Sequence, residues 1–264
     1  MQLHSTKTGL PTRKNRQHKE AALYGGKVLN KVLVAIVCMG LVAGAAKEAK
    51  AAAEGASECY AAVTAKNWAK AYALCSASAD QGDALAQNIL GAMYTFGHGV
   101  AQDDAAAVIW HRKAADQGDA KAQNLLGVMY RNGEGVAQDY AAAVSWFRKA
   151  ADQGVASAQN NLAGMYYYGE GVTQDYAAAV SWYRKAADQG DALAQNSLGA
   201  MYNDGQGVAQ DYIQAHKWHN LAAAGATDAT FRDSARRNRD RTVAKMQPAQ
   251  IAEAQRLASD WRKK

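Results

Sequence analysis

The sequence has none of the short motifs that most often identify an enzyme. It contains no G-x-x-x-x-G-K-[ST] phosphate loop, no H-E-x-x-H zinc motif and no G-x-S-x-G nucleophile elbow. No serine is followed three residues later by a lysine. Ser145, Ser181 and Ser234 have an arginine at that spacing, and an arginine stays protonated and cannot serve as the base. These absences favour a non-catalytic protein that needs no cofactor and no metal.

An apolar run long enough to cross a membrane is also missing. The run VLVAIVCMGLVAG at residues 32–44 is shorter than the roughly 20 residues with which a helix spans a bilayer. Basic residues precede it, and Ala43-Gly44-Ala45 is a candidate cleavage site, as in a secretory signal. We therefore predict a signal peptide over residues 1–45 and a periplasmic or secreted protein. An uncleaved anchor and a start site further along the chain are alternatives.

The net charge of +6 comes from this N-terminal segment. Residues 1–45 carry seven lysines and arginines and one acidic residue, Glu20. The remainder holds 23 basic and 23 acidic side chains. The body of the protein therefore has no overall basic charge to attract nucleic acid, and we expect no nucleic-acid partner.

The sequence does contain an internal repeat with a period of 36 residues. The four copies span residues 82–117, 118–153, 154–189 and 190–225. Each copy holds one version of a glycine-rich stretch, GHGVAQDD, GEGVAQDY, GEGVTQDY or GQGVAQDY. A catalytic loop normally occurs once in a chain, whereas a structural connection recurs in every unit. The stretch is therefore interpreted as architecture.

Within each unit the apolar spacing predicts two helices, which in the second unit cover residues 120–130 and 139–152. The two glycines between them suit a connection that needs positive φ angles. Asp119 and Asp139 can cap the starts of the two helices. Val136 is expected to fill the apolar gap between them.

The repeated pattern A-x-A-Q-N-x-L-G-x-M-Y-x-x-G-x-G-V-x-Q-D-Y continues in the second unit with Ala143, Trp146 and RKAA at 148–151. It resembles the Sel-one-like repeat family, relatives of the tetratricopeptide repeats. The resemblance implies an all-α protein, a right-handed α/α solenoid of 36-residue helix-turn-helix repeats whose units stack into a superhelix and usually bind other proteins. Because a single helix pair cannot bury its apolar face, stacking must supply the core and both ends need caps. We expect a monomer.

Residues 46–81 are predicted to form an N-terminal capping hairpin with helices at 58–65 and 67–79. Cys59 and Cys75 lie at similar distances from the turn, so they can face each other across the hairpin. An exported chain with an even pair of cysteines favours a disulfide. Two buried free thiols are the alternative.

Residues 226–264 are predicted to form capping helices at the C-terminal end, one over 228–246 and one beginning at Pro248. Five arginines are concentrated in the first of them: Arg232, Arg236, Arg237, Arg239 and Arg241. They could contact anionic lipid headgroups or an acidic envelope protein. The alternative is a charged cap that only keeps the protein soluble.

The four units differ mainly in four columns of the first helix, spaced i, i+4, i+7 and i+11. At 100° per residue these columns fall within one stripe about 60° wide. In repeats of this kind the first helix lines the concave side, so a variable stripe is what a recognition groove would show. Neutral drift at exposed positions is the alternative. The predicted partner-binding residues are Leu85, Ile89, Phe96, Lys121, Leu125, Val128, Asn132, Ser157, Asn161, Tyr168 and Asp204.

Other repeated positions are assigned to structure. His216 and His219 have a spacing that could hold a metal, but His219 occupies an aromatic column and no third ligand is evident, so packing is expected. The tryptophan and tyrosine columns are expected in the core. The Arg-Lys pairs at 112–113, 148–149 and 184–185 are expected to be solvated at helix ends, where cations favour the dipole.

These observations predict an exported, non-catalytic scaffold or adaptor that binds a protein or peptide partner in its groove, in envelope regulation, assembly or host interaction. Some cysteine-rich relatives are associated with β-lactam binding or hydrolysis, so such an enzyme is one alternative. Those relatives carry a cysteine pair in each unit, whereas the full units here have none. A structural spacer without a specific ligand is the other alternative.

Overall fold

The computed structural model describes Gly55 and residues 57–263. By its internal contacts the chain divides into Met1–Glu54 and Gly55–Lys264, and the structure below is that of the second unit. The predicted signal peptide and residues 46–54 of the predicted cap lie outside the described residues. None of the helices in the described part has the length and apolar character to cross a membrane.

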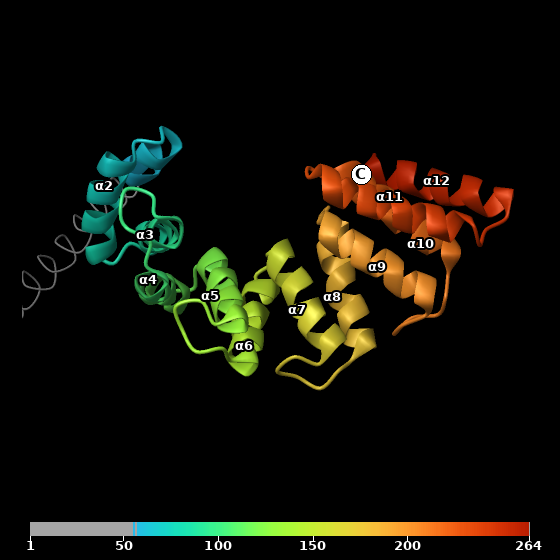
Figure 1. The fold of residues 1–264 in the computed structure, drawn as a ribbon, viewed down its shortest axis with the longest axis horizontal. Helices are drawn as coiled ribbons and strands as arrows, with labels where there is room; N and C mark the ends of the chain where they lie inside the picture. Colours follow the sequence, from blue (N-terminus) through green and yellow to red (C-terminus); the bar gives the residue numbers. More distant parts are fainter. Residues whose placement is uncertain (1–54, 56, 264) are drawn as a thin grey trace, which may run out of the picture. The chain divides into compact units, whose positions relative to one another are not determined.

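All regular structure among the described residues is helical. A helical segment at residues 57–64 precedes the helices labelled in Figure 1. Their bounds are Trp68–Asp80 (α2), Ala84–Phe96 (α3), Asp104–Asp116 (α4), Ala120–Asn132 (α5), Tyr140–Asp152 (α6), Ala156–Tyr168 (α7), Tyr176–Asp188 (α8), Ala192–Asp204 (α9), Tyr212–Gly225 (α10), Ala229–Val243 (α11) and Pro248–Arg262 (α12).

Each helix from α2 to α10 packs mainly against its neighbours in sequence. The pairs α3–α4, α5–α6, α7–α8 and α9–α10 are the four predicted units, and the second helix of each pair also contacts the first helix of the next. The helices α11 and α12 both pack on α10 and close the C-terminal end. The expectation of an all-α solenoid of helical repeats is confirmed.

The aspartates predicted as caps are the N-cap residues of their helices. Asp119 Oδ1 accepts a hydrogen bond from the Ala122 amide at 2.7 Å, and Asp139 Oδ1 accepts one from Ala142 at 2.9 Å. The third unit lacks the first of these caps, because Val155 replaces the aspartate before α7. The helix α5 runs two residues beyond its predicted end, since Gly133 in the left-handed conformation ends it.

The core consists of separate apolar clusters, each shared by two or more consecutive helices. Fully buried alanines such as Ala122, Ala158 and Ala194 allow the helices to approach closely. Larger side chains, among them Leu126 and Phe147, fill the space between neighbouring pairs. Each unit therefore depends on its neighbours for its core, as the solenoid architecture requires.

A buried glutamine in the first helix of each unit connects consecutive helices. Its Nε2 donates to the last carbonyls of the preceding helix at 3.1 Å in every unit. The four donor–acceptor pairs are Gln87–Ala79, Gln123–Ala115, Gln159–Ala151 and Gln195–Ala187. These bonds satisfy carbonyls that a helix end leaves without a partner.

The same glutamines also accept a hydrogen bond from the end of their own unit. Gln117 donates to Gln87 Oε1 at 2.7 Å, and the second and third units repeat this contact at 2.8 Å. Each amide in the first three units thus joins three consecutive helices. The fourth unit breaks the series, because Gly225 replaces the donor and the buried Gln195 Oε1 has no hydrogen-bond partner.

The glycine pair of each connection has two distinct roles. The first, Gly133 in the second unit, has φ 75° and ends its helix. The second, Gly135, has φ 67°, and a Cβ there would lie 2.1 Å from the carbonyl oxygen of Asp104 in the preceding unit. Glycine is therefore needed for close packing between units as well as for the backbone angle.

The disulfide expected in the N-terminal cap is present. Cys59 and Cys75 are bonded, with their Cα atoms 4.9 Å apart, and both are fully buried. Closing a loop of this length stabilises a protein by about 3 kcal/mol, because it restricts the unfolded chain.

The Arg-Lys pairs lie at the ends of their helices and five of the six side chains are exposed, as expected, but they also make contacts that the sequence did not predict. Arg112 Nη2 donates to the Tyr130 hydroxyl of the next unit, and Lys113 Nζ lies 3.7 Å from the ring centroid of Trp110. The next two units repeat both contacts, with Arg148 on Tyr166, Lys149 over Trp146, Arg184 on Tyr202 and Lys185 over Trp182. These side chains contact the tyrosine and tryptophan columns, and the arginines join neighbouring units.

A glutamine side chain at position 225, like those that end the first three units, should stabilise the C-terminal end. A Cβ at position 225 would lie 3.9 Å from Ala192 Cβ, an ordinary contact. We expect Gly225→Ala to raise the free energy of unfolding by about 0.5–1 kcal/mol, because glycine is unfavourable in a helix. Gly225→Gln should add about 1 kcal/mol more through a hydrogen bond to Gln195 Oε1.

Urea-induced unfolding of the two variants and the unchanged protein measures the difference. The alanine variant is the control, since it removes the glycine without supplying the amide. A glutamine variant no more stable than the alanine variant would contradict the proposed link.

Candidate partner-binding surface

The four variable columns lie on the surface of α3, α5, α7 and α9. We call these four columns together the variable stripe. The first column holds Leu85, Lys121, Ser157 and Leu193, and the other three columns lie four, seven and eleven residues later on each helix. None of the eleven predicted partner-binding residues is buried. Eight are exposed, namely Leu85, Phe96, Lys121, Leu125, Asn132, Ser157, Tyr168 and Asp204, while Ile89, Val128 and Asn161 are partly buried. By contrast, the constant columns of the same helices contain the buried alanines, glutamines, leucines and methionines.

Large apolar side chains are concentrated on the variable stripe. The described residues include eight large hydrophobic side chains that are exposed. Five of them belong to the stripe: Leu85 (45% exposed), Phe96 (67%), Leu125 (37%), Tyr168 (68%) and Leu193 (54%). Concentration of apolar surface in one place is typical of an interaction site, whereas scattered apolar residues are normal on any protein.

The three partly buried members of the predicted set also have structural contacts. Ile89 packs against the buried cluster of α2 and α3, and Val128 packs against the cluster of α6 and α7. Asn161 Nδ2 donates to Asn124 Oδ1 of the preceding unit at 3.0 Å. Substitution of these three residues would therefore change packing as well as the surface.

A pocket of about 460 Å³ lies between the second and third units. Asn132 and Tyr168 of the stripe line it, together with Arg131, Gln138, Tyr140, Gly164 and Glu170. The Gln138 side chain donates to the Arg131 carbonyl at 2.7 Å and to the Tyr140 hydroxyl at 3.1 Å, so it fixes the wall of the pocket. The pocket holds one cation and one carboxylate.

A second pocket, of about 160 Å³, lies on α7, α8 and α9 and shares Tyr168 with the first. Its lining residues are Tyr167, Tyr168, Tyr183, Asn196, Ser197, Ala200 and Met201. Burial raises the pKa of Tyr183 to about 12, although a hydrogen bond with Ser197 acts in the opposite direction. The phenol therefore stays protonated at neutral pH.

Sequence reasoning missed several pocket residues, because they lie outside the stripe. Tyr167 is the clearest case. Its column holds Thr95, Arg131 and Asn203 in the other units, so it varies as much as the stripe does. A search for variable columns at the edge of the stripe could have found it. Tyr183 gives no such signal, because it occupies the aromatic core column.

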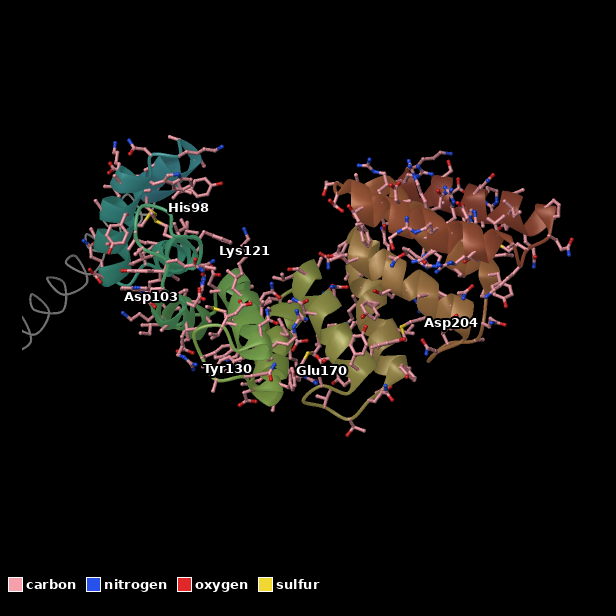
Figure 2. All side chains as sticks on the ribbon, in the orientation of Figure 1. His98, Asp103, Lys121, Tyr130, Glu170 and Asp204 are labelled. Carbon is pink, nitrogen blue, oxygen red and sulfur yellow. A yellow bond between two sulfur atoms is a disulfide. The ribbon has the colours of Figure 1, made fainter. Side chains whose placement is uncertain are left out.

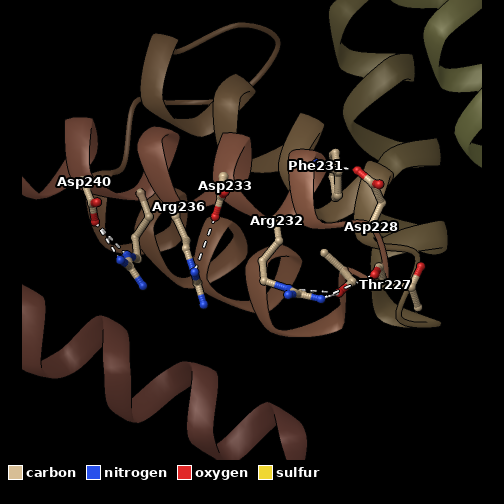
Figure 3. Close-up of polar contacts among 9 residues, drawn as sticks. Thr227, Asp228, Phe231, Arg232, Asp233, Arg236 and Asp240 are labelled. Carbon is tan, nitrogen blue, oxygen red and sulfur yellow. Dashed lines mark hydrogen bonds and ion pairs between the residues drawn. The ribbon is translucent and has the colours of Figure 1, made fainter.

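The C-terminal arginines are mostly engaged within the protein (Figure 3). Arg232 Nη2 donates to the Ala226 carbonyl at 3.0 Å, Arg236 Nη1 lies 3.4 Å from an Asp233 carboxylate oxygen, and Arg239 Nη2 lies 2.8 Å from Asp240 Oδ1. Arg237 and Arg241 are exposed and form no ion pair among the described residues. Three of the five arginines, Arg232, Arg237 and Arg241, therefore have no acidic partner among the described residues.

The histidines predicted to pack do so. Burial lowers the pKa of His111 and of His219 to about 4. Each ring lies against the glycine of the preceding helix and bonds through Nδ1 to an asparagine, Asn88 at 3.0 Å or Asn196 at 3.2 Å. His216 is buried beside α11, and its pKa is lowered by burial and by Arg239. No group of three or more metal-ligating side chains occurs in the described part.

The comparisons with known proteins agree with this architecture. The family model described as Sel1 repeat matches residues 84–119, 120–155, 156–191 and 192–226. The matches are contiguous and begin two residues after the unit boundaries read from the sequence. A search of the curated proteins finds no match.

Solved structures of other proteins are similar over most of the chain. A Sel1 repeat protein from Oxalobacter formigenes is 29% identical, with a TM-score of 0.67 over 78% of this chain and 82% of its own. The protective antigen c5321 of uropathogenic Escherichia coli, which displays an SLR fold, is 32% identical, with a TM-score of 0.50 over 74% of this chain. The match covers 49% of c5321, so this chain spans about half the length of that protein.

The buried histidines predict a pH dependence of stability. An unfolded histidine titrates near 6.5, whereas His111 and His219 titrate at about 4 in the folded protein. As the pH falls from about 6.5 to 4, the unfolded state gains protons that the folded state does not bind, so stability is lost. Each histidine should account for a loss of roughly 3 kcal/mol across this window.

Replacing both histidines by phenylalanine, the residue at position 147 of the second unit, should remove this part of the dependence of the free energy of unfolding on pH. The measurement is the free energy of unfolding at several pH values between 7 and 4, for His111→Phe, His219→Phe and the double variant. Equal slopes in the double variant and the unchanged protein would refute the assignment.

Proposed function

The chain belongs to the Sel1 repeat family, and on that premise we propose that it is a non-catalytic scaffold that binds an extended peptide segment of a partner protein along the variable stripe. Sel1 repeats commonly mediate interactions between proteins. The partner segment would lie across α3, α5, α7 and α9 and contact each unit through a different set of side chains.

The concentration of exposed apolar side chains on the stripe carries this proposal. Five of the eight exposed large hydrophobic side chains in the described part belong to three of the four columns and lie on four helices. Leaving this much apolar area in water in one place is unfavourable, unless a partner covers it. Neutral drift gives no reason for the apolar residues to gather on one stripe.

The chemistry of the smaller pocket supports a non-catalytic role. Ser197 lies there beside the phenol of Tyr183, a pair that could in principle act as nucleophile and base. A base must accept the proton of the serine hydroxyl. With a pKa raised to about 12, the Tyr183 phenol is protonated at neutral pH and cannot do so.

Export is the second part of the proposal. Residues 1–45 have the three parts of a secretory signal, and a disulfide joins Cys59 to Cys75. Disulfides persist in oxidising compartments such as the bacterial periplasm. We therefore place the scaffold in the periplasm or outside the cell, where envelope or host proteins would be its partners.

Selection of peptides from a random displayed library tests the binding function. We expect peptides to bind the unchanged protein and to lose affinity by about tenfold or more for the double variant Leu85→Glu, Leu125→Glu, since a buried charge at an apolar contact is unfavourable. Ile89 is left unchanged, because it also packs against the core.

Ile109→Glu is the matched control, because Ile109 is 56% exposed on α4 and lies outside the stripe. Peptides that bind all three proteins equally would rule out the stripe as the binding site. Circular dichroism of each variant establishes that the helices remain folded.

A fusion to alkaline phosphatase lacking its own signal tests export, because that enzyme is active only where its disulfides form. Residues 1–60 should confer activity in a bacterial host, and residues 46–60 should not. Inactivity of both fusions, with equal amounts of protein present, would overturn the assignment to an exported compartment.

A further inference from the structure

The variable stripe changes character in the third unit, where tyrosines form a pocket. The rings of Tyr167 and Tyr168 meet edge to face, with centroids 4.9 Å apart. The Tyr167 hydroxyl donates to Gln206 Oε1 at 3.0 Å, which holds this ring against the next unit. Together with Tyr183 these rings form the aromatic side of the 160 Å³ pocket. The volume is enough for one side chain of a partner.

The remainder of this pocket is small and polar. Ala200 and Met201 supply an apolar surface, while Asn196, Ser197 and the Tyr183 hydroxyl supply polar atoms. None of its lining residues carries a charge. Asn196 Oδ1 already has His219 and Asn238 as partners, and Ser197 bonds with the Tyr183 hydroxyl. The two hydroxyl oxygens can still accept a further hydrogen bond, which a purely apolar occupant would not donate.

Two carboxylates lie on the chain close to residues that line the pocket, and Figure 2 labels both. Glu170 lines the larger pocket on the other side of Tyr168, and Asp204 lies one helical turn beyond Ala200 on α9. Neither forms an ion pair with another described residue. The cation of the larger pocket, Arg131, belongs to the preceding unit. The third and fourth units therefore supply two negative charges in this part of the surface, while Arg131 and Lys245, whose Nζ lies 3.3 Å from Asn203 Oδ1, supply positive charge there.

We propose that this tyrosine pocket binds an arginine side chain of the partner peptide. The proposal rests on the proposed function, because it names the chemistry that one part of the stripe recognises. The guanidinium would stack on a tyrosine ring, donate to Ser197 and the Tyr183 hydroxyl, and lie near the two carboxylates. Its aliphatic stem would cover Ala200 and Met201. Arginine fits better than lysine, because its planar head stacks on a ring and carries five donors.

Cations on aromatic rings recur inside this protein, which shows that its aromatic columns accept them. Lys149 Nζ lies 3.9 Å from the centroid of Trp146, and the Arg148 guanidinium carbon lies 5.7 Å from that of Tyr166. The pocket at Tyr168 presents the same chemistry at the surface, with no described cation occupying it.

The experiment uses peptides selected on the purified full chain from the random library. Selected peptides should share an arginine, and its replacement by citrulline, which has the same shape without the charge, should weaken binding by about two- to thirtyfold. In Tyr168→Leu, which keeps apolar bulk and removes the ring, arginine and citrulline peptides should bind alike. Phe96→Leu, the same kind of change in the same column of the first unit, should keep the full preference for arginine.

The outcomes separate the two proposals. If peptides depend on Leu85 and Leu125 but contain no shared arginine, or if Tyr168→Leu keeps the preference for arginine, the stripe binds peptides and the tyrosine pocket has another role. If no peptide is selected, or if binding does not depend on Leu85 and Leu125, both proposals are wrong.

Discussion

A buried glutamine amide near the start of each repeat is the contact on which the stacking of the helices depends. Gln123 donates to a carbonyl at the end of α4, lies in α5 and accepts from Gln153 at the end of α6. A buried amide without these partners would be unfavourable by a few kcal/mol, so the three helices must keep one relative position. The same contacts recur at 36-residue intervals in the first three units, and the fourth unit keeps only the donated bond of Gln195.

Because the constant columns are used for stacking, only a narrow part of each first helix remains free to differ. The glutamine, alanine, leucine and methionine columns are buried, and the tyrosine and tryptophan columns contact the Arg-Lys pairs. The variable stripe lies at the surface, between the buried columns and the aromatic columns. A repeat protein can thus change its binding properties without changing its fold, and the proposed peptide surface is a consequence of this division.

The repeat period, the helix pairs and the disulfide could be predicted from the sequence, since each depends on residues close in sequence or repeated at a fixed interval. The pockets could not, because Tyr168 and Tyr183 come from different helices and their meeting depends on how the units stack. For the same reason the contacts of the Arg-Lys pairs with the aromatic columns could not be predicted. Arg112 lies at the end of its helix, and its partner Tyr130 lies 18 residues further along, in the next unit.

The most direct test of this division is to transplant the stripe of one unit into another. Lys121, Leu125 and Asn132 would be replaced together by their counterparts in the fourth unit, leucine, serine and aspartate. Val128 is left unchanged, because it also packs against the cluster of α6 and α7. The account predicts a free energy of unfolding within about 1 kcal/mol of the unchanged protein and a different set of selected peptides. A large loss of stability, or an unchanged set of peptides in a folded variant, would contradict it.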